Sequence, residues 1–269
     1  MSAESTVTIG LLLPDVLGTY SDAGNATILA QRLRWRGIPA EIRTITACDA
    51  PTTSCAVYVL GGGEDTAQHF AADWLRRHDQ LRRALETSAV TLAVCAGLQI
   101  LGRSMSDASG QHYPGLDLLD ITTAPGTRRA VGEVVATCAV PGVGSLTGFE
   151  NHRGVTTLGP GSTPLGQVIT GTGNGTFGGT CGGTSGGTSG EGVLTDRIIG
   201  TYLHGPVLAR NPGLADHILH KVTGQVLPPL DLPDQAALRQ HYLGRMAVSA
   251  PRARPGWLRR KAGNTPRTG

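Results

Sequence analysis

Residues 91–102 constrain the fold more than any other part of the chain, with the sequence Thr-Leu-Ala-Val-Cys-Ala-Gly-Leu-Gln-Ile-Leu-Gly. The apolar and β-branched residues before Cys95 are typical of a buried central strand in a parallel sheet. Two small residues follow, which permit a tight turn, and apolar residues then continue at helical spacing. The stretch predicts a strand, a sharp turn that carries Cys95 and a helix, which is the geometry of a nucleophile elbow.

Such a turn would place the Cys95 sulfur at the carboxyl end of its strand, beside the unpaired N–H groups of the new helix. Those N–H groups favour a thiolate and can hold a developing oxyanion. A buried structural cysteine suits the same kind of sequence, so this segment alone leaves both interpretations open.

Strands and helices alternate around this stretch. Strands are expected over residues 7–13, 40–45 and 56–60, and helices over 25–36 and 66–86. The last helix would turn Phe70 and Trp74 inward. This order predicts an α/β fold with a doubly wound, mostly parallel sheet.

Beyond residue 103 the pattern changes to short strand-like pieces at 116–122, 130–139, 143–149 and 165–169. They predict a β-rich excursion, mainly antiparallel, that packs against one side of the main sheet. The polar cluster Glu150-Asn151-His152 follows one of these pieces. It marks either a functional site or a turn between two strands.

The expected domain organisation is one unit over residues 1–225, a helical extension over 226–249 and a basic, disordered tail over 250–269. Residues 171–190 are almost entirely Gly, Thr and Ser. Such a segment buries too little apolar surface to offset its ordering entropy, so we expect a mobile surface insert.

Composition excludes several classes of function. The chain has 5 cysteines without a C-x-x-C pair, which argues against a disulfide framework and a zinc site, so no metal is expected. Basic residues gather in the tail and few aromatic residues accompany them, which disfavours nucleic-acid binding. No apolar run is long enough to span a bilayer and no export signal is evident, so a cytoplasmic location is expected.

A second candidate site residue comes late in the chain. The expected strand over residues 198–203 ends at His204, before a Gly-Pro turn, and the strand over 56–60 runs into three glycines at 61–63. Carboxyl ends of parallel strands share one edge of a sheet, so Cys95, the glycines and His204 should converge there. A cysteine nucleophile needs a base, and exposed glycine N–H groups bind anions, so the set suits nucleophilic catalysis.

These motifs resemble those of a known enzyme class. The Cys-x-Gly-x-Gln form of residues 95–99, the glycine-rich strand end and the late His204 resemble the class I, triad-type glutamine amidotransferases. Residues 148–154, 165–168, 190–193 and 202–212 are similar to the cobyric-acid-synthase-like branch, and within it to the GatD family of glutaminase subunits of lipid II isoglutaminyl synthase. The resemblance runs from about residue 7 to about residue 222.

The resemblance implies a role for individual residues. It implies that Cys95 is the nucleophile, that His204 is the base and acid, and that the backbone N–H groups of Gly62 and Ala96 form an oxyanion hole.

Substrate binding is implied for two further side chains, Gln99 and Arg129. Arg128 is an alternative to Arg129, and a plain surface pair of arginines is also possible.

The resemblance also implies partners. L-Glutamine would be hydrolysed here, and the ammonia would pass to a MurT-type Mur ligase in a heterodimer. That ligase would amidate the α-carboxyl of D-glutamate in the stem peptide of lipid II, so the chain would meet lipid II only through its partner. No cofactor is expected in this chain, and ATP and Mg²⁺ are expected on the ligase.

One departure from the triad pattern concerns the group that orients His204. Triad enzymes have Glu two residues after the histidine, where this chain has Pro206. Glu150 or a carboxylate of the partner could orient the ring instead, or no acid does so.

Rival functions remain open from sequence alone. An amidotransferase of a cobyric or cobyrinic acid synthase is disfavoured because no G-x-x-x-x-G-K-[ST] motif precedes residue 7. A catalytically silent ligand-binding module is disfavoured by the presence of both Cys95 and His204. A binder of nucleic acids or membrane surfaces that acts through the basic tail is a third possibility.

Overall fold

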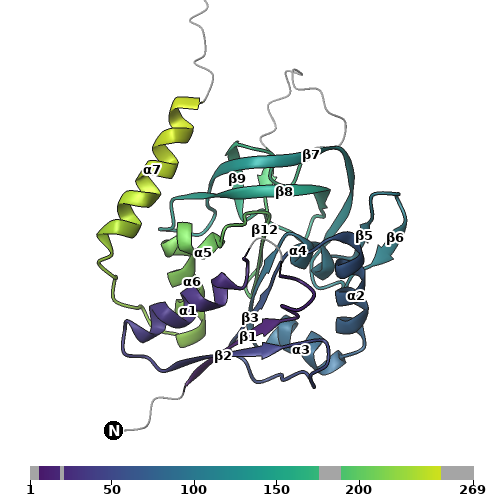
Figure 1. The fold of residues 1–269 in the computed structure, drawn as a ribbon, viewed down its shortest axis with the longest axis horizontal. Helices are drawn as coiled ribbons and strands as arrows, with labels where there is room; N and C mark the ends of the chain where they lie inside the picture. The colour runs from purple at the N-terminus through teal and green to yellow at the C-terminus, as the bar shows by residue number, and fades with distance from the viewer. Residues whose placement is uncertain (1–5, 19–20, 176–188, 250–269) are drawn as a thin grey trace, which may run out of the picture.

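The computed structural model describes residues 6–18, 21–175 and 189–249, with side chains up to residue 244 (Figure 1). Its main sheet has the strand order β11-β12-β4-β3-β1-β2, and all neighbours are parallel except β11. The predicted α/β fold with a mostly parallel sheet is confirmed. The strands are β1 (Val7–Leu12), β2 (Ala40–Ile45), β3 (Val57–Leu60), β4 (Val90–Val94), β11 (Val193–Leu194) and β12 (Ile198–Thr201).

Helices cover both faces of this sheet. Figure 1 shows α1, α5 and α6 on one side and α2, α3 and α4 on the other. The three adjacent strands β3, β4 and β12 are therefore buried along their whole length, which explains their mainly apolar sequences. The helices are α1 (Gly24–Arg34), α2 (Asp65–Arg76), α3 (Asp79–Thr87), α4 (Ala96–Leu101), α5 (Val207–Arg210), α6 (Pro212–Thr223) and α7 (Pro233–Ser249).

The helix predicted over residues 66–86 is in fact two helices. His78 has φ −117° and ψ 69°, which is not helical, and it separates α2 from α3. Trp74 is buried as predicted, but Phe70 is 42% exposed, so its predicted inward orientation is wrong. The inner face of α2 is formed by Ala71, Ala72 and Leu75 together with Trp74, and Phe70 lies outside that arc.

A second sheet follows β4 and α4. Its strand order is β10-β9-β7-β5-β6, and β8 pairs with β7. The predicted β-rich excursion is present, but its main part is one long antiparallel hairpin instead of several short pieces, and β5 runs parallel to β7. The strands are β5 (Ser104–Ser106), β6 (His112–Pro114), β7 (Ile121–Thr137), β8 (Ser145–Leu158), β9 (Gly166–Thr170) and β10 (Gly190–Glu191).

The two sheets meet at the carboxyl end of β12. Figure 1 shows β7 and β8 crossing above β12. His204 forms an isolated antiparallel bridge with Phe149 of β8, with the His204 N–H donating to the Phe149 carbonyl over 2.8 Å. This junction fixes the position of His204 from both sheets.

The glycine-rich insert begins within the folded structure. The N–H groups of Thr172 and Gly173 donate to the Glu150 carboxylate over 2.9 Å each. The Asn174 side chain is buried and exchanges two hydrogen bonds with the backbone of Gly192. Backbone and side-chain hydrogen bonds therefore hold residues 172–174 in place of the missing apolar burial, and the expected mobility of the insert stays a prediction.

Several predictions on flexible segments concern other parts of the chain. Residues 176–188 of the insert and the tail over 250–269 lie outside the described residues. The predicted C-terminal extension contains α7. Within the described residues, none of the helices combines the length and the apolar character that a membrane span requires.

Candidate active site

The predicted strand, turn and helix around Cys95 are present. β4 ends at Val94, α4 begins at Ala96, and Cys95 between them has φ 52° and ψ −105°, a strained conformation for a residue with a side chain. Gly97 is required here, because a Cβ at this position would lie 2.7 Å from the Leu60 carbonyl oxygen. The sharp turn holds the sulfur at the carboxyl edge of the sheet, as an elbow requires.

His204 lies beside this turn, three residues beyond the end of β12. A Cβ on Gly62 would lie 2.8 Å from His204 Cε1 and 3.4 Å from Cys95 Cβ, so all three residues meet at one point. The predicted convergence of the glycine loop, the cysteine and the histidine is therefore correct. Only glycine fits at position 62 without displacing the ring.

A carboxylate that the sequence analysis missed completes this group. Asp22 lies in the loop between β1 and α1, is fully buried and places Oδ2 3.0 Å from His204 Nδ1. The Gly62 N–H donates to the same Asp22 oxygen over 3.0 Å. The loop that carries Asp22 leaves the carboxyl end of β1, at the sheet edge where the other residues meet, and that position was the available signal.

Glu150 does not orient His204. Both of its carboxylate oxygens accept hydrogen bonds from the loop over residues 171–175, as described above. The backbone of Phe149 pairs with His204, and alternation along β8 turns the next side chain away from the ring. Asp22 is the described carboxylate that contacts the His204 ring.

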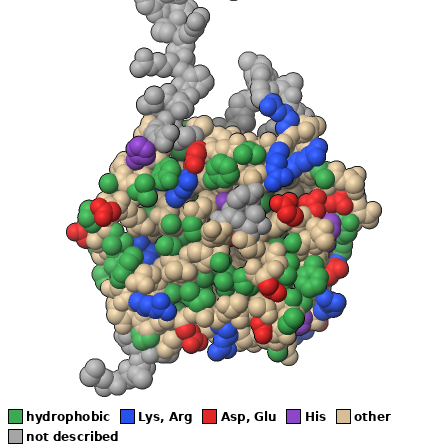
Figure 2. Space-filling view, viewed as in Figure 1, with side chains coloured by type: hydrophobic (Ala, Val, Ile, Leu, Met, Phe, Trp, Pro, Cys, Tyr) green, Lys and Arg blue, Asp and Glu red, His purple; other side chains and the backbone are tan. Residues whose placement is uncertain are grey.

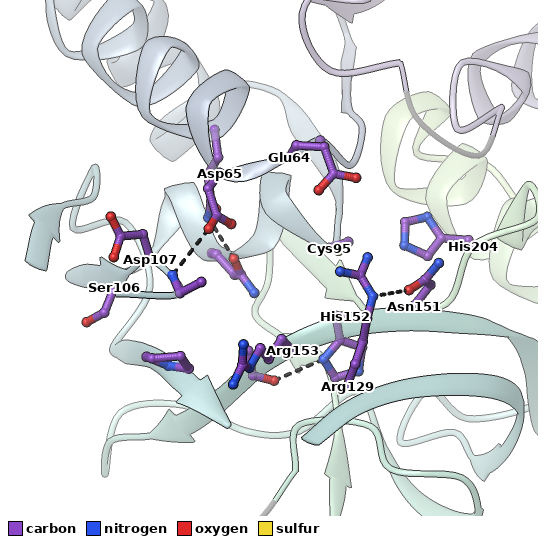
Figure 3. Close-up of a pocket in the computed structure, with 16 residues that line it drawn as sticks. Glu64, Asp65, Cys95, Ser106, Asp107, Arg129, Asn151, His152, Arg153 and His204 are labelled. Carbon is purple, nitrogen blue, oxygen red and sulfur yellow. Dashed lines mark hydrogen bonds between the residues drawn. The ribbon is translucent and has the colours of Figure 1, made fainter. Parts of the chain in front are cut away.

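A cavity opens beside Cys95 and His204 (Figure 3). Arg129 of β7 lines it, and its Nε donates to Asn151 Oδ1 over 2.6 Å, which directs the guanidinium along the cavity wall. Arg128 is not among the residues that line the cavity. The geometry therefore favours Arg129 over Arg128 as the arginine near the sulfur.

The known sequence pattern of the CobB/CobQ-like glutamine amidotransferase domain matches residues 8–212. The chain belongs to this family. The family expected from the sequence motifs is thereby confirmed.

Individual relatives of this amidotransferase are also known. The protein "Lipid II isoglutaminyl synthase (glutamine-hydrolyzing) subunit GatD" of Staphylococcus aureus (strain N315) is 32% identical over 238 residues, which cover 87% of this chain and 92% of that protein. The protein of the same name from Streptococcus pneumoniae (strain ATCC BAA-255 / R6) is 31% identical, covering 77% of this chain and 76% of that protein. A probable cobyric acid synthase of Methanoculleus marisnigri is 31% identical, but the match covers only 30% of that protein.

The electrostatics of the amidotransferase site keep the Cys95 thiol protonated in this conformation. Burial and the Asp22 carboxylate raise the pKa of Cys95 to about 12, and Glu64 acts in the same direction. A hydrogen bond from the Ala96 N–H and the charge of Arg129 lower the pKa, without offsetting the burial. The thiol therefore needs a base to become a nucleophile, and His204 is adjacent.

The two N–H groups expected in the oxyanion hole of the amidotransferase have different partners. The Ala96 N–H is directed at the Cys95 sulfur, and the Gly62 N–H is held by Asp22. Both therefore lie at the reacting centre, and their role as an oxyanion hole stays a prediction.

Gln99 lies in the floor of the amidotransferase cavity and is fixed at both ends. Its Oε1 accepts from Gln68 Nε2 over 2.7 Å, and its Nε2 donates to the Tyr202 hydroxyl over 2.9 Å. The Gln99 amide therefore supports the floor, and its direct contact with a substrate stays a prediction.

Proposed function

We propose that this chain is a glutaminase subunit, which hydrolyses L-glutamine to glutamate and ammonia through a cysteine thioester. The single observation that carries the proposal is the juxtaposition of Cys95, His204 and Asp22 at the end of one cavity. A nucleophile, a base and a carboxylate that holds the base are the parts that acyl transfer requires.

The first half of the reaction forms the thioester. His204 Nε2 takes the Cys95 proton, and the sulfur attacks the side-chain carbonyl carbon of glutamine. The carbonyl oxygen becomes an oxyanion, which the N–H groups of Ala96 and the Gly62 loop stabilise. The carbon–nitrogen bond then breaks, and the His204 imidazolium gives its proton to the leaving ammonia.

The second half releases glutamate. Water attacks the thioester carbon while His204 accepts a proton from it, a second oxyanion forms, and the carbon–sulfur bond breaks to return the thiol. Asp22 holds the ring orientation in both halves and stabilises the imidazolium. For the Gly62 N–H to serve the oxyanion, Asp22 must release it, which is a local rearrangement in the mechanism.

The ammonia would pass to a MurT-type Mur ligase in a heterodimer, and that ligase would amidate the α-carboxyl of D-glutamate in lipid II. The names of the two GatD relatives support lipid II as the molecule that is amidated, and both relatives are matched over most of their length. We further propose that this chain uses no cofactor, and that ATP and Mg²⁺ bind to the ligase.

Replacing the nucleophile and the base tests the proposed reaction. In Cys95→Ser and His204→Ala, glutamate release from L-glutamine should fall by about 10³-fold or more, because each step needs both groups. Enzymatic detection of glutamate, with the chain co-expressed with its ligase, measures this. The control is Cys48→Ser, which removes an exposed thiol outside the site. Substantial activity in Cys95→Ser would contradict the proposal.

A further inference from the structure

Opposite charges lie on two sides of Cys95 at the opening of the cavity. Glu64, just before α2, and Arg129, on β7, line the cavity together with Cys95, and in the view of Figure 3 Cys95 is labelled between them. Figure 2 shows acidic and basic side chains gathered close together on this face of the molecule. The charge of Glu64 raises the pKa of the Cys95 thiol and the charge of Arg129 lowers it, so both side chains lie within electrostatic range of the sulfur.

Arg129 is prepared to bind an anion. Asn151 holds its Nε, and among the described residues its two Nη groups have no hydrogen-bond partner. A guanidinium held at one nitrogen and open at the others can grip a carboxylate in two parallel hydrogen bonds.

Glu64 is the acidic counterpart. Its side chain is exposed, and its carboxylate accepts no hydrogen bond from any described residue. The other acidic residues of the cavity are already engaged: Asp65 accepts from the Ala108 N–H over 3.2 Å, and Asp107 accepts from Ser109, Gln111 and Tyr113. Glu64 therefore differs from them in that neither carboxylate oxygen accepts a hydrogen bond from a described residue, and its charge reaches the Cys95 thiol.

The positions of Cys95, Glu64 and Arg129 along the cavity match a glutamine molecule whose side-chain amide points inward. Cys95 is only 8% exposed, at the inner end of the cavity, whereas Glu64 and Arg129 are exposed at its opening. A glutamine molecule has its reacting amide at one end and its ammonium and carboxylate on one carbon at the other. With the amide at the sulfur, the two charged groups would lie at the opening.

We propose that Glu64 binds the α-ammonium group of glutamine, opposite Arg129, the substrate-binding arginine that the family resemblance predicts and that would hold the α-carboxylate, so that Glu64 makes the site select α-amino acid amides. This inference rests on the proposed glutaminase function and adds the residue that determines specificity. Glu64 is a substrate-binding residue in this scheme and takes no part in proton transfer.

The test compares L-glutamine with 4-carbamoylbutanoate, which is glutamine without its α-amino group. We expect the native chain, co-expressed with its ligase, to prefer L-glutamine in kcat/KM by about 10²-fold, as expected for a charge-assisted contact. Glu64→Gln should reduce that preference by about 10-fold or more, through a higher KM for L-glutamine, with little change for the analogue. Asp65→Asn is the matched control and should keep the preference.

The reciprocal test concerns the carboxylate. L-Glutaminamide carries an amide in place of the α-carboxylate. In Arg129→Ala, the preference in kcat/KM for L-glutamine over L-glutaminamide should fall by about 10-fold or more. Arg128→Ala should keep that preference, because Arg128 does not line the cavity.

The two proposals fail in different ways. If the native chain releases no glutamate from L-glutamine, the glutaminase function is wrong and this inference falls with it. If the native chain is active but Glu64→Gln keeps its full preference, or Asp65→Asn loses as much, the role of Glu64 is overturned while the glutaminase function stands. Activity of Glu64→Gln on 4-carbamoylbutanoate shows that the variant is folded.

Discussion

At the residue scale, Asp22 has two opposing effects on the site. Its carboxylate faces His204 Nδ1 and so fixes which ring nitrogen can exchange a proton with the substrate. The same negative charge, next to burial, raises the pKa of Cys95. Asp22 therefore helps the base and hinders the free thiolate, which makes proton transfer from Cys95 to His204 the route to the nucleophile.

Asp22→Asn should separate these two effects. Glutaminase kcat should fall by about 10²-fold or more, because the ring loses its carboxylate partner. Alkylation of Cys95 by iodoacetamide at about pH 8 should become faster, because removal of the Asp22 charge lowers the thiol pKa. Rates of glutamate release and mass-spectrometric rates of alkylation measure the two effects.

Asp49→Asn is the control for this pair of measurements, since Asp49 is an exposed carboxylate bonded within its own loop to Thr46. Neither rate should change in that variant. A parallel fall of both rates in Asp22→Asn would indicate general damage to the site and contradict the two-effect interpretation.

The residues predicted from sequence share one property. Cys95, His204 and the glycines at 61–63 each follow a clear apolar strand, so the shared edge of a parallel sheet brings them together. Asp22 carries no such local mark, since it lies in a long loop that contains the buried residues Leu13 and Leu17 and has a positive φ at Ser21. Its pairing with His204 depends on the conformation of the loop after β1, and the apolar pattern of the strands does not predict that conformation.

At the scale of elements, Glu191 joins β10 to the end of β12. Its buried carboxylate accepts from the Thr201 hydroxyl and, over 3.0 Å, from the Tyr202 N–H. Tyr202 in turn holds Gln99 and stacks on His152 with ring centroids 3.9 Å apart. The floor of the cavity is therefore tied to a carboxylate in the second sheet.

Burial raises the pKa of Glu191 to about 7 from its ordinary 4.5. Between these values the folded chain binds more protons than the unfolded chain, so this group makes stability fall as pH rises from about 4.5 to about 7 and has no further effect above. Glu191→Gln should remove this dependence of stability on pH. The free energy of unfolding of the variant, relative to that of the native chain, should therefore rise by on the order of 3 kcal/mol between about pH 5 and about pH 8.

Urea unfolding of both chains at the two pH values measures this difference. Glu86→Gln, which alters an exposed carboxylate on α3, should show the same stability difference from the native chain at both. If the difference in free energy of unfolding between Glu191→Gln and the native chain does not change with pH, the predicted rise in the pKa of Glu191 is contradicted.

The elements themselves were predictable to different degrees. The strands β1, β3 and β4 have mainly apolar sequences that specify them. The break between α2 and α3 was not visible, because apolar residues continue at helical spacing across His78. The long β7–β8 hairpin was predicted as shorter pieces, since polar residues such as Thr127 and Arg128 interrupt the apolar pattern at its exposed part.

At the scale of the whole molecule, the active site lies where the two sheets join. The main sheet supplies Cys95 and Gly62, the second sheet supplies Arg129, and the bridge to Phe149 fixes His204 between them. The site therefore depends on the relative position of both sheets.

The proposed heterodimer is testable with the intact chain. Affinity-tagged protein expressed in its native host should capture a Mur-type ligase in about equal amounts, and glutamate release should be higher in the complex than in the chain alone. Mass spectrometry of the captured protein identifies it. Cys95→Ser is the control and should capture the same ligase, because the thiol is buried and not part of the surface. Capture of a cobyric or cobyrinic acid synthase component instead would contradict the proposed partner.

The reacting groups follow four different strands: Asp22 after β1, Gly62 after β3, Cys95 after β4 and His204 after β12. A cut in the chain between β4 and β12 would thus leave the sulfur and the imidazole on separate pieces, each without activity. Catalysis would return only on reassembly of the two pieces, since the chemistry belongs to the complete sheet and to no fragment of it.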